Sequence, residues 1–261
     1  MVHDIMGFPV VILAGRPPKK DALMKYANVE NKVLIEFRGK KVVENCIEAV
    51  RPFATRILVV GLQLGTIPDE PNIEILEMEG EQYDKIFMAI KFLVDHPDWF
   101  EEGRHALFLS GDLPLLNSAM VNRFLERTGD RKFDFYYSIV PKAVFLEKAP
   151  DLEWGYMKIR DGEFASGNLI LLDPKTAADK YDMIKFLSTN RKSFILGVFK
   201  ASPWIFLKLV FGRVRLDDAE NLMTKMFGIT SKLVISDDYE IAFDLDLPEH
   251  LDWLRTKFET A

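Results

Sequence analysis

The chain has 261 residues, of which 48% are hydrophobic and 28% charged, as in an ordinary folded globular protein. This composition argues against a disordered, collagen-like or coiled-coil chain. The formal net charge of −6 argues against a general nucleic-acid-binding protein. A single cysteine, Cys46, excludes an internal disulfide and a cysteine-rich zinc module. No window of about 20 residues lacks charge. We therefore expect no transmembrane helix and a cytoplasmic protein.

Strands and helices alternate over the first 140 residues. Short apolar runs rich in β-branched residues predict buried strands at 9–15, 33–37, 56–61, 72–76, 105–109 and 133–140. Helical spacing of apolar residues predicts helices over 42–50, 82–94 and 118–127, the last capped by Asn117. Residues 16–31 are predicted to form a loop with one helical turn. The alternation predicts an α/β fold with a parallel sheet, in which ligands bind beyond the carboxyl ends of the strands.

The second half of the chain has a different pattern. Residues 156–160 and 168–172 predict a hairpin or paired edge strands, with a turn at Asp161 and Gly162. Further helices are predicted over 174–187, 193–211, 216–227 and 248–258, and strands over 232–235 and 241–245. No Gly/Ser/Pro-rich linker and no repeat interrupts the chain, so we expect a single domain over residues 1–261.

Five motifs occur in an order and spacing that resemble one enzyme superfamily. They are Val11–Gly15, Asn31–Lys40, Ser110–Pro114, Gly167–Leu169 and Asp244–Glu249. The chain resembles the nucleotidyltransferase superfamily, which includes sugar-phosphate nucleotidyltransferases and the molybdenum cofactor guanylyltransferase-like group. The resemblance implies a three-layer Rossmann-like sandwich (the glycosyltransferase-A-like, nucleotide-diphospho-sugar transferase fold) with a mostly parallel central sheet.

The resemblance also implies an activity. The enzyme would transfer a nucleoside monophosphate from an NTP to a phosphorylated acceptor, with Mg²⁺ as cofactor and pyrophosphate as the second product. The acceptor would be a sugar or polyol phosphate, with a pterin phosphate as the next candidate. Residues 1–140 would bind the nucleotide and residues 141–261 the acceptor. The partners would be these small molecules rather than nucleic acid, and the state a monomer or homodimer.

The candidate nucleotide-binding residues follow the predicted strands. A glycine-containing loop after the first strand lets backbone N–H groups approach a base and phosphates closely. A lysine at position 32 can reach phosphate oxygens and stabilise charge on the transferred group. The alternatives are an ordinary turn glycine and a solvated lysine. The nucleotide-binding set is Leu13, Ala14, Gly15, Arg16, Lys32, Gly80 and Asp112, of which Lys32, Asp112 and Arg16 are the catalytic candidates.

Three aspartates are candidate metal ligands. Asp112 ends a predicted strand, where a carboxylate can hold Mg²⁺. Asp244 and Asp246 lie two apart on a predicted strand and so would point to one face. The register of the family motif favours Asp246, with Asp244 as second choice. The alternatives are a turn aspartate at 112 and an N-cap before the helix at Pro248.

The acceptor-binding candidates lie in the second half: Gly155, Tyr156, Asn168, Arg191 and Lys192. The alternatives are turn chemistry for the first three and a solvated helix end for the basic pair. The chain departs from the family at Arg16, where a second glycine is usual. That departure keeps a non-catalytic nucleotide- or sugar-binding relative open. A glycosyltransferase on a similar fold is the other alternative, but it would use a mid-chain Asp-x-Asp in place of Gly111–Pro114.

Other features are assigned structural roles. Cys46 is expected to pack in the core, and a zinc site is not expected because the histidines lack ligand spacing: His3, His96, His105 and His250. Residues 185–232 hold nine Lys or Arg against three Asp or Glu. Within this basic segment, the aromatic stretch 194–211 favours a core helix pair with basic edges. A dimer face, or a peripheral membrane contact, is the alternative.

Overall fold

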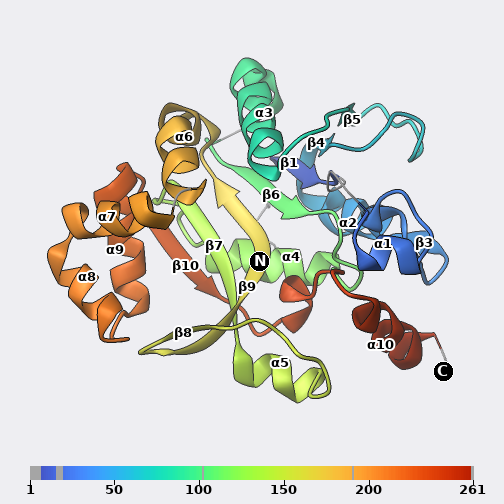
Figure 1. Ribbon diagram of the computed structural model, residues 1–261. Coiled ribbons are helices and arrows are strands. Elements are labelled where there is room, and N and C mark those ends of the chain that lie inside the picture. The colour runs from blue at the N-terminus through green and yellow to red at the C-terminus, as the bar shows by residue number, and fades with distance from the viewer. Residues whose placement is uncertain (1–6, 16–19, 102, 190, 260–261) are drawn as a thin grey trace.

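A computed structural model describes residues 7–15, 20–101, 103–189 and 191–259 (Figure 1). Its centre is an eight-stranded sheet in the order β10-β7-β9-β6-β1-β4-β5, with β8 paired to β9. A separate ribbon pairs two short strands. The strands are β1 (Phe8–Leu13), β2 (Glu36–Phe37), β3 (Lys40–Lys41), β4 (Ala54–Val60), β5 (Ile73–Leu76), β6 (Ala106–Ser110), β7 (Phe135–Pro141), β8 (Met157–Ile159), β9 (Gly162–Leu172) and β10 (Ser231–Ile235).

The sheet is mostly parallel, as predicted. β1 lies between β4 and β6 and runs parallel to both, and β10 runs parallel to β7. The exception is β9, which is antiparallel to both β6 and β7. The hairpin of β8 and β9 confirms the predicted turn at Asp161 and Gly162. The alternative of paired edge strands is wrong for residues 168–172, because that end of β9 lies between β6 and β7 in the middle of the sheet.

Helices cover both faces of the sheet. Val10 and Ile12 of β1 join one buried cluster with residues of α2 and α4, whereas Val11 joins a second cluster with residues of α3, against which α6 packs. This alternation explains why β1 is an unbroken apolar run. The helices are α1 (Ala22–Tyr26), α2 (Val42–Val50), α3 (Gln82–Asp95), α4 (Ser118–Arg127), α5 (Lys142–Lys148), α6 (Pro174–Thr189), α7 (Arg191–Ala201), α8 (Pro203–Val210), α9 (Leu216–Phe227) and α10 (Pro248–Phe258).

Two of the predicted strands differ in the structure. Within 33–37 only Glu36–Phe37 forms a strand, β2, and the chain before it is a 3-10 helix over Lys32–Leu34, capped by the Asn31 side chain, which accepts from Val33 N. The segment predicted as a strand over 241–245 is a 3-10 helix (Tyr239–Ala242) followed by irregular chain. The backbone amide of Leu245 in this segment donates to the carbonyl oxygen of Asp112 at 3.1 Å. Asp112 lies in the loop after β6, so this hydrogen bond does not pair the segment with a strand. Short buried apolar runs do not by themselves specify a strand partner.

The aromatic stretch is also different from its prediction. Residues 193–211 form two helices, because Ser202 caps α8 by accepting from Ile205 N and Pro203 occupies the first turn. The core role favoured for this stretch is wrong for much of its apolar surface. Trp204 is 68% exposed and Phe211 70% exposed. Figure 1 shows α7, α8 and α9 gathered beyond the β10 side of the sheet.

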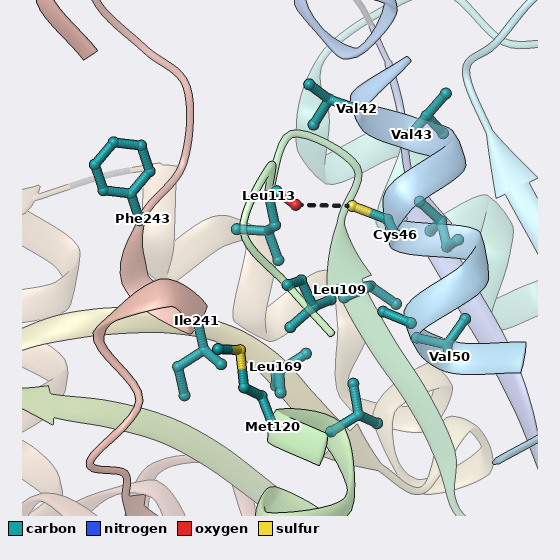
Figure 2. Close-up of a cluster of buried hydrophobic side chains, with 14 of the residues drawn as sticks. Val42, Val43, Cys46, Val50, Leu109, Leu113, Met120, Leu169, Ile241 and Phe243 are labelled. Carbon is teal, nitrogen blue, oxygen red and sulfur yellow. Dashed lines mark hydrogen bonds between the residues drawn. The ribbon is translucent and has the colours of Figure 1, made fainter. Parts of the chain in front are cut away.

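Cys46 is fully buried, as predicted (Figure 2). Its thiol on α2 points to the loop after β6, with Sγ 3.6 Å from the carbonyl oxygen of Leu113. Burial raises the pKa of Cys46 to about 12. Through this contact between Cys46 and Leu113, helix α2 packs against the loop that carries Asp112.

Among the described helices, none has both the length and the apolar character that a membrane-spanning segment needs.

Candidate active site

Lys32 lies at the start of the 3-10 helix that follows the loop from β1. The Asn31 side chain holds this segment to the loop, because its amide donates to the carbonyl of Ala14 at 2.7 Å. Lys32 Nζ lies 2.6 Å from Asp112 Oδ2 and also contacts Asp246 Oδ1. Burial alone would lower the pKa of Lys32, but the two neighbouring carboxylates raise it above its ordinary value. The side chain therefore stays an ammonium at neutral pH.

Asp112 follows β6, at the carboxyl edge of the sheet. Its side chain is only 4% exposed, and the hydroxyl of Ser110 donates to Oδ1. Gly111 N donates to the carbonyl of Leu13 at 2.9 Å, so the loops after β1 and β6 are tied together. The bond from Leu245 to the Asp112 carbonyl then brings the late segment to the same place.

The structure brings together all three predicted metal-ligand candidates. Carboxylate oxygens of Asp112, Asp244 and Asp246 lie within 4.8 Å of one another. Burial, reinforced by the charges of Asp112 and Asp246, raises the pKa of Asp244 to about 7. The strand that was expected to align Asp244 with Asp246 is absent, so the grouping comes from long-range contacts. Hard carboxylate oxygens crowded in this way form a donor set suited to Mg²⁺.

The alternative role of Asp246 as a helix cap is wrong. The residue before α10 is Leu247, and no side chain caps this helix. Instead, His250 on the first turn of α10 lies behind the aspartates. Its Nδ1 is 3.2 Å from the carbonyl oxygen of Asp244, and its ring stacks on Trp154 with centroids 4.6 Å apart. These contacts hold the backbone on which two of the carboxylates sit.

One cavity, of about 290 Å³, opens at the carboxyl ends of β1 and β6. Among the predicted nucleotide-binding residues, Leu13, Gly15, Lys32, Gly80 and Asp112 line it. Ala14 is buried and contributes the carbonyl that holds the Asn31 amide. Arg16 lies outside the described residues. The remaining lining is Asp21, Val33, Glu81, Gln82, Lys85 and Ser110.

A second cavity, of about 670 Å³, is lined by the two aspartates of the cluster that do not line the first. Both Asp244 and Asp246 line it. So do Gly155, Tyr156 and Asn168, the three predicted acceptor-binding residues whose side chains the structure describes. The amide of Asn168 donates to the carbonyl of Ile241 at 3.2 Å, and the Tyr156 hydroxyl is buried without a hydrogen-bond partner among the described residues. The side chains of Arg191 and Lys192, at the start of α7, lie outside the described residues.

The family model of the MobA-like NTP transferase domain matches residues 10–143. The chain belongs to this family, and it is a nucleotidyltransferase. The match includes Lys32 and Asp112, whereas Asp244 and Asp246 lie in the half beyond it. A comparison with curated proteins finds no match.

Solved structures show the same fold over nearly the whole chain. A hypothetical transferase from Thermus thermophilus is 25% identical, with a TM-score of 0.76, over 94% of this chain and 100% of that one. A 4-diphosphocytidyl-2C-methyl-D-erythritol synthase from Anaerococcus prevotii is 13% identical, with a TM-score of 0.59, over 97% and 99%. A 2-C-methyl-D-erythritol 4-phosphate cytidylyltransferase from Francisella tularensis is 11% identical, with a TM-score of 0.58, over 97% and 100%. These likenesses place the transferase in the nucleotide-diphospho-sugar transferase fold.

Lys85 is a cavity residue of this nucleotidyltransferase that the sequence analysis missed. It lies on the first turns of α3 and is only 5% exposed. A Cβ added to Gly15 would lie 2.5 Å from Lys85 Nζ, and one added to Gly61 would lie 2.6 Å from Gly15 Cα. The end of the Lys85 side chain therefore packs against Gly15, and the close approach of the Gly15 backbone leaves no room for a Cβ at residue 61. The sequence did contain a signal that Lys85 is buried. Lys85 precedes Ala89 by four residues, a spacing that places both side chains on the same, buried face of the helix.

Proposed function

We propose that the protein is a Mg²⁺-dependent enzyme that transfers a nucleoside monophosphate from an NTP to a sugar or polyol phosphate, releasing pyrophosphate. The observation that carries the proposal is the position of the aspartate cluster between two cavities. Asp112 lines the smaller cavity, and Asp244 and Asp246 line the larger one. Donor and acceptor phosphates in these two cavities would meet at the cluster. Residues 1–140 would then bind the nucleotide and residues 141–261 the acceptor.

The donor set fits a divalent cation. The carboxylates of Asp112, Asp244 and Asp246 share one small volume, and the ammonium of Lys32 pairs with two of them. Burial, together with the charges of the other two aspartates, raises the pKa of Asp244 to about 7. Asp112, Asp244 and Asp246 would hold Mg²⁺. When bound, the ion would neutralise phosphate charge and orient the triphosphate. A pterin phosphate remains the second acceptor candidate.

The reaction needs little from the protein beyond positioning and charge. An ionised oxygen of the acceptor phosphate forms a bond to the α-phosphorus, and the bond to the bridging oxygen breaks, so the electron pair leaves with pyrophosphate. No general base is required, since the attacking oxygen carries no proton. Lys32 and Lys85 line the cavity and can stabilise charge on the phosphates. The backbone N–H groups of Gly15 and Gly80, which also line this cavity, would serve as further donors to phosphate oxygens.

A polyol phosphate acceptor is supported by two further observations. The larger cavity has polar and aromatic walls from Tyr156, Asn168 and Trp154. In addition, the protein of the same fold from Francisella tularensis is named as a cytidylyltransferase of a methylerythritol phosphate. These features favour a small hydroxylated phosphate over a polymer.

The decisive assay is pyrophosphate release from each of the four NTPs with Mg²⁺ and a panel of sugar and polyol phosphates. We expect one pair to give turnover and Asp112→Asn to lower kcat by about 100-fold or more. Asp237→Asn is the matched control, because that carboxylate is 72% exposed and pairs with Arg127. It should retain wild-type turnover.

The same assay separates the alternatives. Consumption of a nucleotide sugar with release of a nucleoside diphosphate, and no pyrophosphate, would identify a glycosyltransferase. Tight NTP binding without turnover on any acceptor would identify a non-catalytic relative. Full turnover of Asp112→Asn would refute the site assignment while leaving the reaction class intact.

A further inference from the structure

An exposed apolar surface lies on α7 and α8, and none of its residues lines either cavity. Six large side chains between 46% and 70% exposed form what we call the α7–α8 patch: Leu196, Phe199, Trp204, Leu207, Val210 and Phe211. Monomeric soluble proteins rarely expose apolar residues in such density, and a cluster of this kind marks an interaction surface.

The patch is part of a built helix pair. Ile205 is only 4% exposed and anchors α8 to the rest of the fold, and Val198 does the same for α7. Phe199 and Phe206 pack edge to face, with centroids 5.3 Å apart, and so join the two helices. On α8, the positions 204, 207 and 211 fall on one face. The fold therefore fixes these side chains while leaving them in solvent.

Exposed basic side chains accompany the patch. Lys200 follows Phe199, Arg213 lies two residues beyond Phe211, and both side chains are exposed. The surrounding segment 185–232 carries nine Lys or Arg against three Asp or Glu, in a chain whose net charge is −6. The rest of the molecule is therefore strongly acidic. An anionic surface would attract this segment and repel the remainder, which would orient the molecule with the patch toward that surface.

We propose that the α7–α8 patch is a peripheral membrane-binding surface for bilayers that contain anionic lipids. Trp and Phe beside Lys and Arg are the side chains that enter the headgroup region of a bilayer. A second copy of this chain fits less well. A two-fold contact would place the same basic segment against itself, and like charges across an interface are unfavourable. The proposal does not depend on the proposed reaction.

The surface is connected to the larger cavity through the β8–β9 hairpin. The amide of Arg160 donates to the carbonyl of Val214 at 2.8 Å, and Asp161 pairs with Arg215 at 3.2 Å. Figure 1 shows β8 beside the connection between α8 and α9. Because Met157 of β8 lines the larger cavity, a membrane-bound molecule would hold this cavity close to the lipid surface.

The test is co-sedimentation of the full chain with phosphatidylcholine vesicles, with and without about a third phosphatidylglycerol. We expect binding to the anionic vesicles at low salt and weaker binding at high salt. Trp204→Ser/Phe211→Ser should reduce the bound-to-free ratio about tenfold or more, because two aromatic anchors are lost. Lys200→Glu/Arg213→Glu should reduce it as well. Leu64→Ser is the matched control, since Leu64 is 69% exposed outside the patch.

A spectroscopic measurement supports the same test. Brominated lipids should quench the tryptophan fluorescence of the bound protein, and Trp204→Phe should bind nearly as well while losing most of this quenching. The proposal is overturned if the wild-type chain does not sediment with anionic vesicles at low salt, or if the Trp204/Phe211 variant binds as well as the wild type. It is also overturned if the wild type is a dimer that this variant converts to a monomer.

Discussion

The contact of Lys32 with the aspartates gives a prediction with a calculable size. Lys32 Nζ lies 2.6 Å from a carboxylate that is 4% exposed. At roughly 3 Å and an effective dielectric constant of about 20, the gross attraction is about 5 kcal/mol. Replacing Lys32 with methionine keeps the apolar stem and removes the charge. Asp244 can take up a proton in response, because its pKa is already about 7.

After this proton uptake, we expect Lys32→Met to lower the free energy of unfolding by about 3 kcal/mol, as for other buried pairs that lose one partner. For a chain of this size, this corresponds to a loss of roughly 6–12 °C in Tm. The deficit should shrink below pH 7, because Asp244 is protonated there without the substitution. Mg²⁺ should raise the Tm of Lys32→Met more than that of the wild type, since the cation replaces the missing charge.

The assay is thermal unfolding followed by circular dichroism, in EDTA and then in millimolar Mg²⁺. Lys40→Met is the control. Its ammonium lies 2.7 Å from Glu48, nearly the same distance, but both side chains are about half exposed. Such a surface pair contributes less than about 1 kcal/mol. The reasoning is refuted if Lys32→Met and Lys40→Met lose the same stability in EDTA, or if Mg²⁺ stabilises both equally.

Three further predictions concern the scaffold. Gly167→Ala should lower the free energy of unfolding in urea by about 1–3 kcal/mol, because its Cβ would lie 2.7 Å from the carbonyl oxygen of Ser138. Gly155→Ala should not, because a Cβ there would meet no atom of the described residues within 4 Å. Cys46 should resist thiol reagents at pH 8 until the protein unfolds, since burial raises its pKa to about 12; labelling of the native protein would contradict its position. Burial lowers the pKa of His105, so its neutral form contributes stability above about pH 6.5 that is lost as the pH falls, and His105→Gln should flatten the dependence of unfolding free energy on pH between 7 and 5.

Local patterns determined much of the framework. The apolar runs of β1, β4 and β6 predict buried central strands, because a strand covered on both faces needs no polar alternation. The position of Asp112 directly after β6 then predicts a carboxylate at the ligand-binding edge of the sheet. Asn117 is confirmed as the cap of α4, since its side chain accepts from the first amides of that helix.

Only the tertiary structure decided how the two halves of the site meet. Asp244 was expected beside Asp246 through strand alternation, yet no strand forms there, and a backbone bond from Leu245 to the Asp112 loop brings the segment in. In the sequence, Lys85 is indistinguishable from the other charged residues of an amphipathic helix. Its burial against Gly15 is visible only in the folded structure. These placements depend on contacts between residues far apart in the chain.

Sequence alone therefore determined the edge of the sheet at which ligands are expected to bind, the candidate metal ligands, and the basic, aromatic composition of the segment 185–232. The tertiary structure decided which apolar side chains are covered. Helical periodicity shows that Trp204 and Phe211 share a face of the helix. The periodicity is the same for a face in the core and for a face in solvent, so it does not say which of the two applies. Because Ile205 on another face of α8 docks into the fold, Trp204 and Phe211 stay exposed, and a stretch expected in the core becomes a surface.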